Sequence, residues 1–281
     1  MSRAGSRISW WNEALEAECL NIAHRGARAY EPENTLPAFA LAPKLGAHVL
    51  ELDVHLTADG HVVVHHDDDV LRCTDAADRF PGRDSYFISD FSLAELRELD
   101  GGSWFADGAR AVRIPTLDEV LELAEADSTF VNIELKMIPR MYRELAPRVL
   151  ECVDRARARR LVLVTSFDHR ALMDVRARNE EIATGVLSSD GLADPVRYLA
   201  LLDADAYHPS CDAMGVYAAD GKLDVAAIEA LRAADKQINV WTCNEPDSMQ
   251  RLVAAGVTGI ITDYPDRLRR VLLESSPSDP E

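Results

Sequence analysis

The sequence has 281 residues, of which 47% are hydrophobic, and it carries a formal net charge of −18. This composition is typical of a globular protein with a sizeable core. The excess of acidic residues argues against binding to nucleic acid or to anionic lipid, since both require a basic surface. The five cysteines are widely spaced and form no Cys-x-x-Cys pair, a pattern that favours reduced thiols in a cytosolic protein.

Neither terminus nor interior carries a membrane signal. No stretch approaches the roughly 20 apolar residues needed to span a bilayer, and residues 1–18 contain no apolar run of signal-peptide length. We therefore expect a cytoplasmic protein without stable membrane association. The sequence leaves open whether the chain is a monomer or a homodimer.

The N-terminal part begins with a short apolar run over residues 19–23, which predicts a buried strand. The polar segment His24-Arg25-Gly26 follows it. Asn34 is expected to cap a helix that runs towards Gly46, with Pro43 bending or shortening it.

A hairpin is predicted next. Glu51–Leu56 and Val62–His65 are separated only by Thr57–Gly60, too few residues for a crossover helix, and Asp59-Gly60 can supply the positive φ of a tight turn. Residues 68–115 lack regular patterning apart from a helix expected over Ser92–Leu99. We interpret them as an insertion within one domain.

From Thr116 onward, predicted helices and strands alternate, which implies parallel pairing. Together with the strands near residues 20 and 50, they give eight units, which is the number that closes a (β/α)8 barrel. A doubly wound open sheet is the alternative, but no G-x-G-x-x-G follows the first strand. One domain is expected over 1–281, with a core over about 19–272 and a frayed tail over 275–281. The later strands are expected at 130–136, 161–165, 182–187, 205–208, 238–242 and 259–262, and the helices at 117–126, 142–159, from the Asp168 cap, 195–202, 225–234 and 247–255.

The strand ends of this barrel collect polar residues, and the carboxyl ends of barrel strands form the active site of such folds. Three carboxylates that meet there repel one another and require a cation, and an all-oxygen set favours Mg²⁺ or Ca²⁺. Arg25 and Lys136 would supply positive charge around a phosphate. The candidates are His24, Arg25, Glu51, Asp53, Glu134, Lys136, Ser166, Phe167, His208, Trp241, Asn244 and Asp263.

Each of these motifs also has a simpler interpretation. Glu51-Leu52-Asp53 is compatible with solvent-facing alternation, and Glu134-Leu135-Lys136 with a same-face ion pair. The hairpin register predicts that His66 lies opposite Glu51 or Asp53 and that His65 points outward. His48, His55 and His61 are interpreted as surface or turn residues, and His169 as a residue that follows a helix N-cap.

A set of short segments occurs in a fixed order along the chain. The set consists of His24-Arg25-Gly26, Glu33-Asn34-Thr35, Glu51-Leu52-Asp53-Val54, Thr57-Ala58-Asp59-Gly60, His66-Asp67, Ile114-Pro115-Thr116-Leu117, Glu134-Leu135-Lys136, Trp241-Thr242-Cys243-Asn244 and residues 256–265. In this order the segments resemble the glycerophosphodiester phosphodiesterases of the phospholipase-C-like superfamily, from His24 to about Arg267. Asp100-Gly101-Gly102-Ser103-Trp104-Phe105 also resembles the end of that family's insertion.

The resemblance implies a (β/α)8 barrel that hydrolyses glycerophosphodiesters to glycerol 3-phosphate and an alcohol, through a cyclic phosphate. It implies His24 and His66 as the acid/base pair, with His24 preferred as the base. It implies a divalent Ca²⁺ or Mg²⁺ held by Glu51, Asp53 and Glu134, with Arg25 and Lys136 on the phosphate. Pocket-wall roles are expected for Phe167, Trp241 and Asn244.

Other functions remain as alternatives at this point. A related phosphodiesterase could act on lysophospholipid head groups, a metal-dependent lyase or aldolase could use the same acids, and a phosphate-binding module could lack turnover. The alcohol group of the substrate is not encoded in any motif. Selectivity is expected to depend on residues 68–115 and on the loop over 209–222.

Overall fold

Eight parallel strands close into a barrel in the computed structural model, which describes residues 7–106, 110–137, 141–211 and 222–275. Neighbouring strands pair around the ring, and β1 closes it by pairing with both β2 and β9. This ring confirms the predicted (β/α)8 barrel. Its strands are β1 (Leu20–Ala23), β2 (Val49–Leu56), β4 (Phe130–Leu135), β5 (Val162–Ser166), β6 (Ala183–Ser188), β7 (Ala206–Pro209), β8 (Gln237–Val240) and β9 (Gly259–Thr262).

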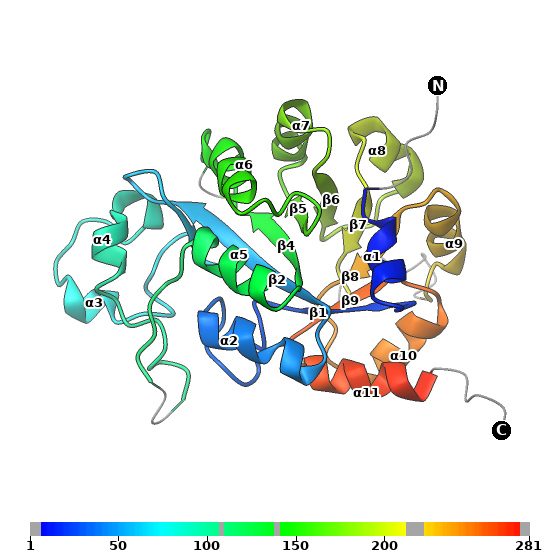
Figure 1. The fold of residues 1–281 in the computed structure, drawn as a ribbon, viewed down its shortest axis with the longest axis horizontal. Coiled ribbons are helices and arrows are strands. Elements are labelled where there is room, and N and C mark those ends of the chain that lie inside the picture. The colour runs from blue at the N-terminus through cyan, green and yellow to red at the C-terminus, as the bar shows by residue number, and fades with distance from the viewer. Residues whose placement is uncertain (1–6, 107–109, 138–140, 212–221, 276–281) are drawn as a thin grey trace.

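The helices that lie between successive barrel strands in the chain surround the ring (Figure 1). Alternate strand residues point outward, so Leu50, Leu52 and Val54 of β2 pack in the layer between strands and helices. Among the described residues, no helix is long and apolar enough to cross a membrane. The surrounding helices are α2 (Leu36–Leu41), α5 (Leu117–Ala126), α6 (Leu145–Arg155), α7 (His169–Arg178), α8 (Pro195–Leu202), α9 (Val225–Ala233), α10 (Pro246–Ala254) and α11 (Pro265–Ser275).

The hairpin predicted after the second barrel strand is present. The short strand β3 (Val62–Val64) runs antiparallel to β2, with Val64 opposite Val54, and Gly60 in the turn has a φ of +83°. Glycine tolerates this conformation because it has no Cβ. The chain then leaves the ring for the residues interpreted as an insertion.

The described residues of this segment, 68–106 and 110–115, contain little regular structure beyond α3 (Ala76–Arg79), the 3₁₀ turn η2 (Ile88–Asp90) and α4 (Leu93–Leu96). They lie to one side of the barrel next to β3 (Figure 1). A separate cluster of buried apolar side chains stabilises them, and Val63 of β3 belongs to it. Ser92 caps α4 in a reciprocal capping box with Glu95, which explains why this helix was visible in the sequence.

The amino-terminal end of the barrel is closed by α1 (Ser9–Ala14), which the sequence did not predict. Ile8 and Trp11 join the apolar residues at the strand starts, and Trp11 stacks on Phe130 with ring centroids 4.5 Å apart. Only six residues form this helix, too few for a periodic signal. Its stability therefore comes from packing against the barrel.

The predicted cap of the first barrel helix requires correction. Asn34 does not cap the first barrel helix. Thr35 does, because its Oγ1 accepts the N–H of Ala38. The helix ends at Leu41, and a 3₁₀ turn (η1, Pro43–Leu45) follows, as Pro43 predicted. The helix α11 lies over residues for which no element was predicted.

Candidate active site

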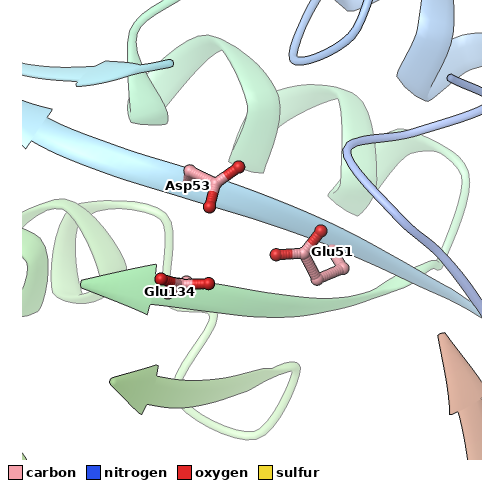
Figure 2. Close-up of side chains that lie close together, drawn as sticks. All are labelled: Glu51, Asp53 and Glu134. Atoms are coloured by element: carbon pink, nitrogen blue, oxygen red, sulfur yellow. The ribbon is translucent and has the colours of Figure 1, made fainter. Parts of the chain in front are cut away.

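Three carboxylates from two adjacent strands meet inside the carboxyl end of the barrel. The parallel register of β2 and β4 sets Glu51 beside Asn132 and Asp53 beside Glu134. Each of the three acids offers a ligand oxygen, and these atoms lie within 4.8 Å of one another (Figure 2). All three side chains are buried. The interpretation of Glu51-Leu52-Asp53 as solvent-facing alternation is therefore wrong.

The protonation of these acids reflects their crowding. Burial, together with the charges of Asp53 and Glu134, raises the pKa of Glu51 well above its usual range. Burial also raises the pKa of Glu134. Burial alone would raise the pKa of Asp53, but Lys136 and Arg25 hold it far below the usual value. The site carries more buried negative charge than the nearby cations stabilise, which favours a bound cation.

The residues present fit a hard divalent metal ion. Carboxylate oxygens are the ligands preferred by Mg²⁺ and Ca²⁺, and three of them converge here from rigid strands. This donor set contains no thiolate and no imidazole, the ligands that zinc sites usually include. The choice between Mg²⁺ and Ca²⁺ does not follow from the ligands alone.

Two cationic side chains flank the acid cluster. Lys136 Nζ lies 2.8 Å from Glu134 Oε1 and 3.5 Å from Asp53 Oδ1. The backbone N–H of Arg25 donates to Glu51 Oε2 at 2.8 Å, a contact that depends on the left-handed conformation of Arg25, with φ of +53°. Its Nε atom is buried and makes no hydrogen bond in the described part of the chain, but it lies 3.4 Å from Asp53 Oδ2. Arg25 therefore lines the cavity and also contacts the acid cluster.

Asn34 has a role at the site that the sequence interpretation missed. Its side-chain Nδ2 donates to Asp53 Oδ2 at 2.9 Å, while its Oδ1 accepts the backbone N–H of Asp53 at 3.4 Å. Asn34 itself adopts a φ of +56°, a conformation that asparagine tolerates better than most residues. These two hydrogen bonds orient the Asp53 carboxylate through tertiary contact, so no local pattern could reveal them.

The ring of His24 is held by Asp263, which follows the last barrel strand. His24 Nδ1 lies 2.6 Å from Asp263 Oδ1. A carboxylate only accepts hydrogen bonds, so Nδ1 carries the proton and Nε2 is left with a free electron pair. Burial lowers the pKa of His24 despite the opposing effect of Asp263, which keeps the imidazole neutral near pH 7.

Asn244 supports this pair and does not act as the expected pocket wall. Its Nδ2 donates to Asp263 Oδ2 at 2.9 Å, and its Oδ1 accepts the backbone N–H of Asp263 at 2.9 Å. Asp263 was among the residues collected at the strand ends, but no role was derived for it. Its role depends on the closure of the barrel, which brings β9 next to β1.

His66 has a matching carboxylate partner. Its Nδ1 lies 2.7 Å from Asp67 Oδ1, and Arg72 Nε contacts the other oxygen of Asp67 at 2.6 Å. The imidazole of His55 also reaches the backbone oxygen of His66, at 3.1 Å. The same hydrogen-bonding argument therefore leaves Nε2 of His66 free to exchange a proton.

The expected register of the hairpin and the expected environment of two histidines need correction. The strand β3 ends at Val64, and the backbone N–H of His65, not that of His66, bonds to Asp53. His65 is buried and its Nε2 lies 3.1 Å from the oxygen of Asp69, so it does not point into solvent. His55 is buried as well, with Nδ1 3.0 Å from the hydroxyl of Tyr142. Tyr142 lies 87 residues further along the chain than His55, so this contact is a tertiary one.

These groups surround a small cavity of about 100 Å³. Phe167 and Trp241 form part of its wall and meet edge to face, with ring centroids 5.5 Å apart. The indole N–H of Trp241 donates to the oxygen of His208, which fixes the ring. The cavity is lined by His24, Arg25, Glu51, His66, Asn132, Glu134, Lys136, Thr165, Phe167, Leu187, Trp241, Thr242 and Ile261.

Comparisons with known proteins agree with this geometry. The family model for the glycerophosphoryl diester phosphodiesterase family matches residues 24–267. A glycerophosphodiester phosphodiesterase of Caldanaerobacter subterraneus is 35% identical over 249 residues, which cover 89% of this chain and 96% of the relative. One from Bacillus altitudinis is 34% identical, with the same coverage of each chain.

A solved structure shows the same similarity in three dimensions. It is an Oleispira antarctica phosphodiesterase in complex with the product sn-glycerol-3-phosphate, with a TM-score of 0.77 and 30% sequence identity. The match covers 90% of this chain and 96% of the Oleispira chain.

Proposed function

We propose a reaction mechanism for this chain, which belongs to the glycerophosphoryl diester phosphodiesterase family and is a glycerophosphodiester phosphodiesterase. In this proposal His24 and His66 are the acid/base pair for hydrolysis to glycerol 3-phosphate and an alcohol. The observation that carries it is the pair of histidines, each bonded through Nδ1 to a carboxylate and each lining the same cavity.

The substrate is a small glycerophosphodiester whose phosphate lies near Arg25 and Lys136. Both side chains are cationic and line the cavity. The Oleispira relative binds sn-glycerol-3-phosphate, which is the product expected here. Charge-assisted hydrogen bonds of this kind stabilise phosphoryl oxygens as their charge increases.

Glu51, Asp53 and Glu134 would hold one divalent ion, Ca²⁺ or Mg²⁺, at the edge of the same cavity. When bound, such an ion polarises the phosphoryl oxygens and offsets their negative charge. Asn34 and the backbone N–H of Arg25 orient two of these carboxylates before any ligand binds. The protein thus fixes the ligands in place in advance.

His24 acts first as the base. Its neutral ring accepts through Nε2 the proton of a glycerol hydroxyl, whose oxygen attacks the phosphorus atom. The bond from phosphorus to the alcohol oxygen breaks, and His66 donates its Nε2 proton to that oxygen. The products of this step are a five-membered cyclic phosphate and the free alcohol.

Water completes the reaction with the roles reversed. His66, now neutral, accepts a proton from water as the water oxygen attacks the cyclic phosphate. His24 returns its proton to the glycerol oxygen that leaves, which yields glycerol 3-phosphate and restores both rings. The imidazole group, whose ordinary pKa is about 6.5, is suited to such exchange near neutral pH.

The test compares substrates whose leaving groups differ in their need for an acid. Glycerophosphocholine releases an alkoxide that requires protonation, whereas the p-nitrophenyl ester of glycerol phosphate releases a stable phenolate. We expect His66→Ala to lower the rate of the first step, measured as alcohol release in a single turnover, by about 10²-fold or more with the choline ester and far less with the nitrophenyl ester. His24→Ala should lower the rate of this step to a similar extent with both substrates.

Two outcomes would overturn the proposal. Full activity of both histidine variants would exclude them as the acid/base pair, and release of choline phosphate instead of glycerol 3-phosphate would exclude the assigned bond cleavage. A lysophospholipid in the same assay tests the alternative substrate class. Phosphorus NMR during turnover should show the cyclic phosphate as a transient resonance.

A further inference from the structure

The carboxylates that hold the two histidines are themselves connected by charged side chains. Arg72 Nε lies 2.6 Å from Asp67 Oδ2, and Arg28 Nη1 lies 3.6 Å from Asp263 Oδ1. Each histidine is therefore followed by a carboxylate and then by an arginine. The two arginines approach from different segments, Arg72 from the insertion and Arg28 from the loop between β1 and α2.

Both arginines meet at one buried carboxylate, Glu33. Its Oε1 contacts Arg72 Nη2 at 2.7 Å, and its Oε2 contacts Arg28 Nε at 3.0 Å. The Glu33 side chain is 4% exposed, whereas those of Arg28 and Arg72 are 33% and 43% exposed. Glu33 is thus the fixed centre of the network, and the arginines reach it from the surface.

The charge state of this centre is well defined. Burial alone would raise the pKa of Glu33, but the hydrogen bond from Arg72 and the charges of Arg25 and Arg28 lower it to about 2. Glu33 is therefore ionised near neutral pH. Arg25 also contacts Glu33 Oε1, through Nη1 at 2.8 Å, so the phosphate-facing arginine shares the same carboxylate.

We propose that Glu33, Arg28 and Arg72 are positioning residues that connect the two acid/base histidines. Glu33 orients both arginines, each arginine orients one aspartate, and each aspartate directs the Nε2 atom of its histidine into the cavity. The inference rests on the proposed function, because it takes His24 and His66 as the acid/base pair. It adds that the two pairs form one unit, in which the insertion takes part through Arg72.

A network that served stability alone would behave differently. Removing a member would lower the fraction of folded protein but leave kcat unchanged among the folded molecules. Removing a member of a positioning unit lowers kcat with little change in KM, because the orientation of the imidazoles matters in the transition state and neither arginine lines the cavity.

The experiment is a set of double-mutant cycles on the full chain with glycerophosphocholine and metal. Arg28→Gln, Arg72→Gln and the double variant are compared in the presence of Glu33 and in the Glu33→Gln background. We expect each single arginine variant to lower kcat about tenfold, with KM within about threefold. With Glu33 present, the double variant should deviate by about threefold or more from the product of the single effects.

In the Glu33→Gln background the deviation should disappear, because the two arginines then share no partner. Glu33→Gln itself is expected to raise KM as well, since Glu33 also contacts Arg25, and so the arginine pair carries the test. Arg97→Gln is the matched control: this arginine lies in the insertion and pairs with Glu119 at 2.6 Å, away from the cavity. Its kcat should equal that of the wild type.

A second measurement does not depend on turnover. In the wild type, the Nδ1 protons of His24 and His66 should give slowly exchanging resonances in proton NMR, because each is held by a carboxylate. Arg72→Gln should broaden the His66 resonance, and Glu33→Gln should broaden both. Unchanged resonances in Glu33→Gln, or independent effects of the two arginines on kcat, would overturn the inference.

The two proposals can fail separately. If the wild type cleaved no glycerophosphodiester, the proposed function would be wrong, and the ring resonances would still show whether Glu33 connects the two histidines. If His24→Ala and His66→Ala abolish turnover while Arg28→Gln and Arg72→Gln act independently, the proposed function holds and this inference is wrong.

Discussion

At the scale of single residues, the site is organised by groups that neutralise or orient charge. Asp53 keeps a low pKa because Lys136 and Arg25 lie beside it, whereas Glu51 receives no comparable cationic contact and its pKa is raised. The pKa values of two acids on one strand thus differ because their charged neighbours differ. Such differences decide which groups can bind a cation without first losing a proton.

The first prediction concerns metal binding at Glu51. In wild-type protein, Ca²⁺ or Mg²⁺ at about a hundred times its Kd should raise the free energy of unfolding by about 2.7 kcal/mol. Glu51→Gln should lose this response and hydrolytic activity, because a ligand charge is gone. In chelator the same variant should be at least as stable as the wild type, since it removes a buried like charge.

Thermal denaturation with and without chelator measures both effects. Glu122→Gln, an exposed position on α5, is the control and should keep the wild-type response. A metal-dependent stabilisation of Glu51→Gln equal to that of the wild type would exclude Glu51 as a ligand.

The second prediction concerns Gly26, next to Arg25. Gly26 has a φ of +81°, and an added Cβ would lie 2.8 Å from backbone and side-chain carbons of Ala38. Gly82 has a similar φ of +79° with open space around it. Gly82→Ala should cost about 1 kcal/mol for the left-handed conformation, and Gly26→Ala about 1–3 kcal/mol more for the contact.

Urea unfolding of both variants measures this difference, and Gly26→Ala should also lower activity because the loop carries Arg25. Equal destabilisation of the two variants would show that the close approach to Ala38 has no energetic effect.

At the scale of elements, the barrel separates stability from chemistry. The strand starts are filled by an apolar cluster and closed by α1, whereas the strand ends carry the acids and histidines. The loop between β1 and α2 and the hairpin of β2 and β3 each supply one histidine. Strands therefore position the three acids, and the segments that follow strands position the two histidines.

The third prediction tests whether α1 contributes to stability but not to the chemistry. Trp11 is 1% exposed, stacks on Phe130 and donates its indole N–H to the oxygen of Arg160 at 3.2 Å. Trp11→Ala should lower the free energy of unfolding by about 3–5 kcal/mol. Because Trp11 packs at the opposite end of the strands from the cavity, kcat of the folded variant should stay within about twofold of the wild type.

Chemical unfolding and steady-state kinetics at low temperature measure the two quantities. The control is Leu201→Ala on α8, whose side chain is 76% exposed and whose removal should cost little stability. A loss of kcat in fully folded Trp11→Ala would show that the two ends of the barrel are coupled.

At the scale of the whole molecule, the folded state buries several histidines in neutral form. Burial lowers the pKa of His55 and of His208 to about 3. His208 lies inside the barrel, where its Nε2 accepts a hydrogen bond from Asn239 at 3.1 Å. Folding therefore excludes protons that the unfolded chain binds below pH 6.5.

The fourth prediction follows from the sign of this linkage. Between pH 6.5 and 3 the unfolded chain binds more protons at His55 and His208 than the folded protein does, so the stability contribution of both groups falls as the pH falls. The free energy of unfolding should decrease from pH 7 to pH 5. His208→Gln, which keeps an acceptor for Asn239, should show a smaller decrease than the wild type.

Urea unfolding at both pH values, in chelator, measures the difference between the two proteins. Comparing wild type and variant cancels the contributions of Glu51 and Glu134, whose raised pKa values have the opposite effect. Identical pH dependence of the two proteins would contradict a neutral, buried His208.

The sequence by itself determined the alternation of strands and helices, and through it the barrel. Hydrophobic periodicity and capping are local, so Thr116 and Asp168 could be assigned as helix caps from the sequence alone. Local spacing also set Glu51 and Asp53 on one face of a strand, whereas the acid/base roles of His24 and His66 came from the family resemblance. The short helix α1 and the orientation of His65 carried no such signal.

Only the tertiary structure decided how these residues work together. Asp263 reaches His24 because β9 closes onto β1, and Arg72 reaches Glu33 because the insertion folds back over the first loop. Asn34 faces Asp53 and leaves the helix cap to Thr35. The physical reason is that ion pairs and burial join residues far apart in the chain, whereas local propensity acts over a few residues at most.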